Sequence, residues 1–186
     1  MTAPRIAPVP RDRRDERTEE LLAPMRRPDG SDLNLFATLA HHPRLLKRWS
    51  AFGGTLLYRG TLSGRDRELL IMRTAWHCRA HYEWGQHVAI ARDAGVSDDE
   101  IARIPAGPDA EGWSSEDAAL LRAADELHAD SRIGDATWAA LAERYDEAQL
   151  IELCMVVGQY HLVAFTLNSL GVQAEPGLPE MPERSA

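Results

Sequence analysis

Three side chains in one stretch of the sequence have the types and spacing for acid–base chemistry. Glu83 and His87 are four residues apart, which places them on one face of a helix. A carboxylate so placed favours the protonated imidazole and can orient the ring of a general acid or base. A second carboxylate, that of Glu68, could join them if the chain folds back. The alternative is an exposed Glu83–His87 ion pair, worth roughly 0.2–0.5 kcal/mol, which is the simpler interpretation of this spacing alone.

The helix that carries these residues must break for Glu68 to reach the other two. In one straight helix Glu68 and His87 would lie about 28 Å apart, at 1.5 Å per residue. The run His77-Cys78-Arg79 is polar and forms helices poorly, so we expect the break there. A second helix is then expected from about Ala80 to Ala94. Folded back in this way, the two helices would bring both carboxylates near the imidazole.

The same stretch supplies the side chains that we expect to wall such a pocket. They are mostly aromatic, with one thiol and one further imidazole: Trp76, Cys78, His81, Tyr82 and Trp84. On the last long helix, Tyr160 and His161 could line the same pocket. Their apolar neighbours favour a structural role for both.

A metal site among the histidines is the next possibility. His77 and His81 are four residues apart and His87 follows, as in some metal-binding helices. The expected break falls between the first two, however, and the spacing is not a recognised zinc pattern. We therefore expect no metal site among these histidines.

The two cysteines, Cys78 and Cys154, do not form a Cys-x-x-Cys redox pair. Cys78 could be a nucleophile, because a thiol near a helix N-terminus has a lowered pKa. Cys154 lies between Leu153 and Met155, which is typical of a thiol packed in the core. Two cysteines are too few for a disulfide framework and fit a reducing cytoplasm.

The rest of the chain is organised to position this stretch. Apolar residues recur at helical spacing from Thr18 to Leu170, and no period-two alternation marks a strand, so the fold is predicted to be all-α. Residues 1–17 are rich in proline and charge and are expected to form an N-terminal arm. Residues 18–175 form the predicted domain. Residues 176–186 are expected to be a flexible tail that buries little.

Composition excludes several classes of function. The net charge of -8 over 186 residues argues against nucleic-acid binding, which needs a basic surface. There is no uninterrupted apolar run long enough to span a bilayer, and the first residues lack the apolar core of a signal peptide. We therefore expect a cytoplasmic protein without membrane or nucleic-acid partners.

The sequence resembles the carboxymuconolactone decarboxylase family, which includes the alkylhydroperoxidase D-like proteins. The matching segments are residues 67–73 (RELLIMR) and 82–87 (YEWGQH), with further similarity from His42-Pro43 to Gly171-Val172. The resemblance implies an all-α helical bundle with a central antiparallel helix hairpin that carries the site. It also implies homo-oligomers (a dimer, trimer or hexamer) with sites close to subunit interfaces.

The sequence departs from the peroxidase branch of that family at two positions. That branch carries Glu, then Cys-x-x-Cys, then His four residues after the second cysteine. When Glu68 and His87 are aligned with that Glu and His, Ala80 and Glu83 stand where the cysteines would be. Without those thiols, peroxide reduction through a disulfide has neither nucleophile nor resolving partner.

The resemblance therefore points to the decarboxylase side of the family. There Glu68, Glu83 and His87 would be catalytic in a cofactor-free lyase, decarboxylase or isomerase acting on a small lactone or activated carbonyl acid. A positioned His or Glu would protonate the enolate-like carbanion. Two alternatives remain open: an alkylhydroperoxidase-like antioxidant activity through Cys78, and a non-catalytic oligomer that binds a ligand.

Overall fold

The computed structural model describes residues 3–183, and within that range the chain is helical without β-strands. The prediction of an all-α fold is confirmed. The α-helices are α1 (Glu16–Leu22), α2 (Asn34–Leu39), α3 (Pro43–Tyr58), α4 (Gly64–His77), α5 (His81–Asp93), α6 (Asp98–Arg103), α7 (Ser115–Asp130), α8 (Asp135–Ala142) and α9 (Glu147–Leu170). Short 3₁₀ helices lie before α1 (Arg11–Arg13), after α1 (Ala23–Met25) and after α6 (Ile104–Ala106).

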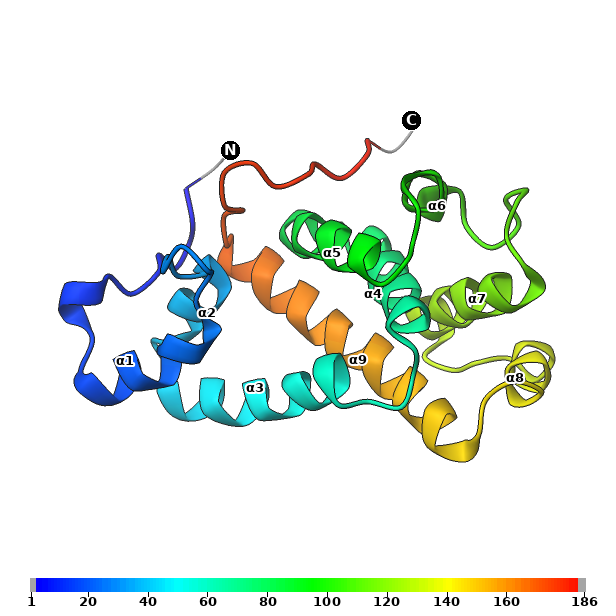
Figure 1. Ribbon diagram of the computed structural model, residues 1–186, viewed down its shortest axis with the longest axis horizontal. Helices are drawn as coiled ribbons and strands as arrows, with labels where there is room; N and C mark the ends of the chain where they lie inside the picture. The colour runs from blue at the N-terminus through cyan, green and yellow to red at the C-terminus, as the bar shows by residue number, and fades with distance from the viewer. Residues whose placement is uncertain (1–2, 184–186) are drawn as a thin grey trace.

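The predicted break between α4 and α5 is confirmed. Helix α4 ends at His77, and Arg79 adopts a left-handed conformation with φ of 52°. This conformation reverses the chain, so that α5 begins at His81 and runs back along α4 (Figure 1). The N-terminus of α4 is capped by Ser63, whose hydroxyl accepts a hydrogen bond from the amide of Asp66 at 3.1 Å.

Helix α4 lies at the centre of the core, between α5, α7 and α9. Four consecutive residues of α4 are completely buried: Leu69, Leu70, Ile71 and Met72. A helix that is apolar on every side must be covered on every side, which explains why three helices pack around it. Helix α9 crosses the middle of the molecule, with α3 on one flank and the α4–α5 pair on the other (Figure 1).

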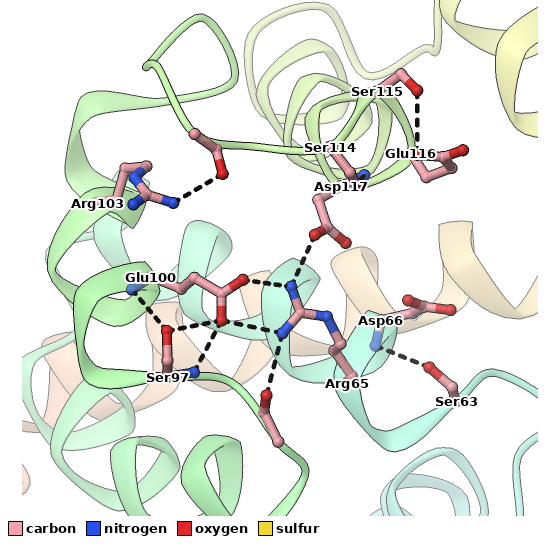
Figure 2. Close-up of polar contacts among 12 residues, drawn as sticks. Ser63, Arg65, Asp66, Ser97, Glu100, Arg103, Ser114, Ser115, Glu116 and Asp117 are labelled. Atoms are coloured by element: carbon pink, nitrogen blue, oxygen red, sulfur yellow. Dashed lines mark hydrogen bonds and ion pairs between the residues drawn. The ribbon is translucent and has the colours of Figure 1, made fainter.

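One arginine joins the start of α4 to two neighbouring elements. The Arg65 guanidinium contacts Glu100 of α6 at 2.6 Å and Asp117 of α7 at 2.7 Å, as Figure 2 shows. Glu100 also forms a capping box with Ser97 at the start of α6. These ion pairs hold the pKa of Glu100 down at about 2, and the hydrogen bond from Arg65 is the largest cause. The network fixes the position of α4, the helix that carries Glu68.

By length and composition alone, helix α9 is long and apolar enough to cross a membrane: it has 24 residues, and the mean hydropathy of its most apolar window is 1.6. Polar residues such as Glu152 and Gln159 interrupt its apolar run, so the sequence shows no uninterrupted apolar segment there. In the structure 56% of its most apolar window is buried inside the protein. Among the described residues it therefore occupies the place of a core helix in a globular bundle.

The N-terminal segment is attached to the helical domain. The side chain of Arg14 is 3% exposed and forms ion pairs with Asp32 at 2.9 Å and Glu19 at 3.2 Å. Asp32 also binds Arg11 and Arg26, and these guanidinium groups lower its pKa to about 2. Residues 3–14 thus form a strap. The part of the predicted arm at residues 1–2 lies outside the described residues.

The C-terminal segment differs from the expected tail. Residues 176–183 have no regular secondary structure, but Met181 is buried in the main core cluster. The physical reason is Gly85 on α5: a Cβ atom there would lie 3.0 Å from the carbonyl oxygen of Pro179. The missing side chain lets the segment lie directly on α5. The boundary at residue 175 and the flexibility of residues 184–186, which lie outside the described range, stay predictions.

Candidate functional site

A cavity of about 380 Å³ lies between α3, α5 and α9, beside the segment that precedes α3. Most of its polar side chains come from α5 and α9, while Arg26 and the α3 residues Ser50 and Tyr58 also line it. Its apolar wall comes mainly from α2, α3 and the end of α9. The apolar part is formed by Leu35, Phe36, Trp49, Leu57, Ile90, Val163 and Leu167. A mostly apolar cavity with few converging polar groups is typical of a small-molecule site.

Glu68 and His87 are brought together by the α4–α5 hairpin. The Nδ1 atom of His87 lies 2.7 Å from Oε2 of Glu68, whose side chain is fully buried. The other carboxylate oxygen accepts a hydrogen bond from Nε of Arg67 at 3.1 Å. Because the carboxylate accepts from Nδ1–H, Nε2 of His87 is the ring nitrogen for proton exchange with a ligand. His87 lines the cavity and is 7% exposed.

Glu83 also lines the cavity, but it does not pair with His87. It is 2% exposed, and among the described residues neither of its carboxyl oxygens has a hydrogen-bond partner. Burial raises the pKa of Glu83 well above its usual range, and the nearby charge of Glu68 adds to the shift. Burial of this kind favours the protonated, neutral form of the carboxyl group, which can donate a proton. The exposed ion pair considered from the spacing is therefore not formed.

Two residues of α9 complete the polar side of the cavity. The rings of Tyr160 and His87 meet edge to face, with centroids 5.0 Å apart. Burial, followed by the charge of Glu68, raises the pKa of Tyr160, so its hydroxyl stays protonated. Gln159 lines the cavity and packs against Gly53 of α3, where a Cβ atom would lie 3.3 Å from its amide nitrogen.

Sequence reasoning missed Gln159 and assigned Tyr160 a structural role. A signal for Gln159 was present in the glycine pair at positions 53 and 54, which allows a close approach to α3. What the sequence did not show is which element approaches there.

The expected pocket walls are corrected by the structure. All five predicted side chains lie within the described residues, and of these Tyr82 alone lines the cavity. Trp76 and Trp84 pack against each other in the core, with ring centroids 6.2 Å apart. His81 is exposed at the start of α5. The helical period explains the difference, since Trp84 projects away from the face that carries Glu83 and His87.

Cys78 lies half-buried at the end of α4, away from the cavity. Burial raises the pKa of the Cys78 thiol to about 11. The lowered pKa considered from the sequence is therefore not found. The thiol lies instead near His128 of α7 and His161 of α9, and these three side chains could hold a metal ion. The histidines considered from the sequence, His77, His81 and His87, are not brought together.

Comparison with known proteins identifies a matching family model and solved structures with a similar fold. Residues 43–126 match the model of the carboxymuconolactone decarboxylase family. No curated protein sequence matches the chain significantly.

Several solved structures share the fold. An uncharacterized peroxidase-related protein from Ralstonia eutropha, described as an alkylhydroperoxidase AhpD core, has a TM-score of 0.81 at 20% identity, covering 94% of this chain and 95% of its own. A peroxidase-related protein from a Silicibacter species has a TM-score of 0.81 at 14% identity, covering 96% and 97%. The debrominase Bmp8 in complex with 2,3,4-tribromopyrrole has a TM-score of 0.77 at 15% identity, covering 92% and 91%. At these identities the likeness establishes the fold, which is the expected alkylhydroperoxidase D-like helical bundle.

Proposed function

Because this chain belongs to the carboxymuconolactone decarboxylase family through residues 43–126, we propose that it is an acid–base enzyme. In this proposal Glu68, Glu83 and His87 carry out the reaction without a cofactor. Its reaction would be a decarboxylation, another lyase step or an isomerisation of a small lactone or activated carbonyl acid. One observation carries the proposal: the Glu68–His87 pair and the neutral Glu83 meet at one cavity.

The three residues divide the work in this proposal. In a decarboxylation, the electron pair of the breaking C–C bond moves onto the neighbouring carbonyl, and an enolate forms as carbon dioxide leaves. The neutral Glu83 donates a hydrogen bond to the oxygen where this charge develops. The protonated His87 delivers a proton from Nε2 to the carbanion carbon, while Glu68 stabilises and orients the ring. In an isomerisation, His87 removes and returns the proton.

The walls of the cavity support a small and largely apolar substrate. A volume of about 380 Å³ suits a molecule of one or two rings, and aromatic side chains such as Trp49 and Phe36 provide flat contacts. The debrominase relative is described with a bound tribromopyrrole, a small ring compound. This bound ring compound supports the view that the fold accommodates a compact cyclic ligand.

His87→Ala tests the proposal most directly. A panel of lactones and β-keto acids is followed by ultraviolet absorbance and by carbon dioxide release. With a compound that the wild type turns over, the variant is expected to lose about 100-fold to 10,000-fold in kcat. His41→Ala, at an exposed histidine, is the matched control and should keep full activity. Circular dichroism and gel filtration monitor the fold, and unchanged kcat in folded His87→Ala would refute the proposal.

The peroxidase alternative has less support. Cys78 lies outside the cavity, and its raised pKa keeps the thiol protonated at pH 7. If Cys78 were the nucleophile, the wild type would consume hydroperoxide with a thiol reductant and Cys78→Ser would not. A non-catalytic ligand-binding protein would instead bind panel compounds without turning any of them over.

A cytoplasmic homo-oligomer stays part of the proposal. Support for self-association comes from large apolar side chains that α9 exposes: Ile151, Met155, Leu162 and Phe165. Exposed apolar patches of this kind often mark protein–protein contacts. Sedimentation velocity gives the subunit number, and a monomer at micromolar concentration would refute this part.

A further inference from the structure

A second cluster of reactive side chains lies outside the cavity, where the ends of α4 and α7 meet the middle of α9. It consists of Cys78, His128 and His161. The acid–base reaction proposed above uses none of them. The sequence separates these residues by 50 and 33 positions, so no spacing pattern could have revealed them.

The donor atoms already stand close to the distances that a metal ion requires. Sγ of Cys78 and one ring nitrogen from each histidine all lie within 4.8 Å of one another. Nδ1 of His128 is 2.9 Å from Nε2 of His161. In a tetrahedral zinc site, with bonds of about 2.05 Å to nitrogen and 2.3 Å to sulfur, the nitrogens are about 3.3 Å apart and sulfur is about 3.6 Å from each. Small side-chain rotations cover these differences.

The ring of His161 is held in the orientation that a ligand needs. Its Nδ1 lies 2.8 Å from the carbonyl oxygen of Val157, one turn earlier on α9. A ring that donates Nδ1–H to a carbonyl presents the lone pair of Nε2, and Nε2 is the atom that faces His128. Metal-bound histidines in proteins are oriented by this kind of contact.

His128 rests on a rigid support. The ring of His77 stacks on it, with centroids 4.6 Å apart and an angle of 15° between the planes. His77 in turn contacts Asp125 at 2.6 Å through Nε2, and Arg73 holds the same carboxylate at 2.6 Å. Asp125 thereby fixes the His77 ring, on which the ring of His128 is stacked.

Cys78 is tied to the same helix as His161. The side-chain amide of Asn168 donates a hydrogen bond to the carbonyl oxygen of Cys78 at 2.8 Å. Cys78 caps the C-terminus of α4, and the left-handed Arg79 follows it. These two constraints fix the backbone that aims the thiol at the histidines, while the side chain keeps its freedom to rotate.

From this arrangement we propose that Cys78, His128 and His161 bind a zinc ion with an open fourth position. One thiolate and two imidazoles are a ligand set that suits Zn²⁺. His128 is exposed and the other two are half-buried, so solvent reaches the ion and a water molecule can occupy the fourth position. On binding, the thiol proton passes to solvent, His128 exchanges its Nδ1 proton through solvent for one on Nε2, and the ion replaces the contact between the two histidines.

The test measures metal binding directly, independently of any catalytic activity. The full-length protein is treated with chelator, dialysed and titrated with Zn²⁺ by calorimetry. Cobalt serves as the spectroscopic substitute: Co²⁺ bound through a thiolate gives a near-ultraviolet sulfur-to-metal band and intense visible bands typical of tetrahedral geometry. One ion per chain is expected, with both sets of bands.

Variants locate the site. Cys78→Ser should abolish the sulfur-to-cobalt band, and His161→Ala should weaken zinc binding on the order of 100-fold, at least as much as the loss of an outer-shell partner. Cys154→Ser is the matched control for the thiol and His41→Ala for the imidazole, and both should bind like the wild type. Circular dichroism verifies that the variants are folded.

Two results would overturn the proposal. One is the absence of stoichiometric Zn²⁺ binding by the wild type. The other is a cobalt spectrum unchanged in folded Cys78→Ser, since the sulfur ligand would then lie elsewhere. Neither result bears on the acid–base proposal, because His87→Ala tests that separately.

Discussion

Oε2 of Glu68 and Nδ1 of His87 lie 2.7 Å apart, and this contact joins the two arms of the α4–α5 hairpin inside the core. A carboxylate without exposed surface is stable there because it is held by the imidazole and by Arg67. Burying this pair costs desolvation free energy, which apolar side chains at the same two positions would avoid. That cost is understandable if Glu68 serves to orient His87.

Glu68→Gln should reduce kcat by about 100-fold or more, because the amide cannot stabilise an imidazolium as the carboxylate does. KM should change little, since Glu68 does not line the cavity. Steady-state kinetics on a substrate found with the panel gives the split. A KM effect with kcat intact would show that Glu68 shapes the cavity and does not act through His87.

Glu83→Gln should raise stability at neutral pH. The pKa of Glu83 is raised in the folded protein by burial, so the folded state holds its proton over a pH range in which the unfolded state has lost it. This contribution to stability is full below the unfolded pKa and is lost as pH rises towards the folded pKa. Glutamine keeps the shape without titrating.

The measurement for Glu83→Gln is the free energy of unfolding in urea between pH 4 and pH 8. The variant should lose the decline that the wild type shows above about pH 4.3, the ordinary pKa of glutamate. Glu20→Gln, at an exposed helix position, is the control. Parallel pH curves for wild type and Glu83→Gln would contradict a neutral Glu83.

Asp32→Asn should loosen the N-terminal strap. The pKa of Asp32 is lowered to about 2 with Arg11, Arg14 and Arg26 as partners, so its contribution is present above the unfolded pKa and is lost as pH falls through the folded one. The shift corresponds to about 2 kcal/mol at most, and less after solvent screening.

Limited trypsin digestion detects the loosening through cleavage after Arg11 and Arg14. Trypsin is expected to cleave Asp32→Asn faster than the wild type. In a second experiment, brief incubation of the wild type with an acid protease should give faster cleavage as the pH is lowered towards 3. Asp29→Asn provides the comparison, because its carboxylate binds only its neighbour Ser31 among the described residues. Equal cleavage rates would mean that Asp32 does not hold the strap.

Gly85→Ala should have opposite effects in two forms of the chain. In the full chain the new Cβ would lie 3.0 Å from Pro179 O and 3.1 Å from Leu178 Cβ, and such overpacking costs about 1–3 kcal/mol. In a chain that ends at Glu175 the clash is gone. Alanine should then stabilise α5 by up to about 1 kcal/mol through its higher helix propensity.

Thermal unfolding of the four proteins gives both differences. Gly54→Ala is the control for propensity, since a Cβ atom there meets nothing within 4 Å. If Gly85→Ala shifted Tm equally in both chain lengths, the C-terminal segment would not be seated on α5.

How much of the site could be predicted depended on how local the signal was. Glu83 and His87 share a helix, so their spacing placed them together, and the weak helix formers at His77 to Arg79 located the reversal that brings Glu68 to them. The walls of the cavity were not predictable in this way. Trp84 neighbours Glu83 in sequence yet faces the core, because adjacent residues on a helix point about 100° apart.

The C-terminal segment shows the same limit. Its prolines and glycines correctly indicated the absence of helix, but composition says nothing about where an irregular segment lies. Gly85 and the pocket for Met181 determine that, and they belong to other parts of the chain.

By itself, the sequence determined the helices, the hairpin, the family resemblance and the candidate acid–base residues, because periodicity, capping and short motifs are local properties. The tertiary structure alone decided that Glu68 and not Glu83 pairs with His87, that burial favours the protonated form of Glu83, and that Cys78 meets His128 and His161. These outcomes depend on which helices pack together and on how much water they exclude. Both are properties of the assembled core, in which burial sets the charge state of each group.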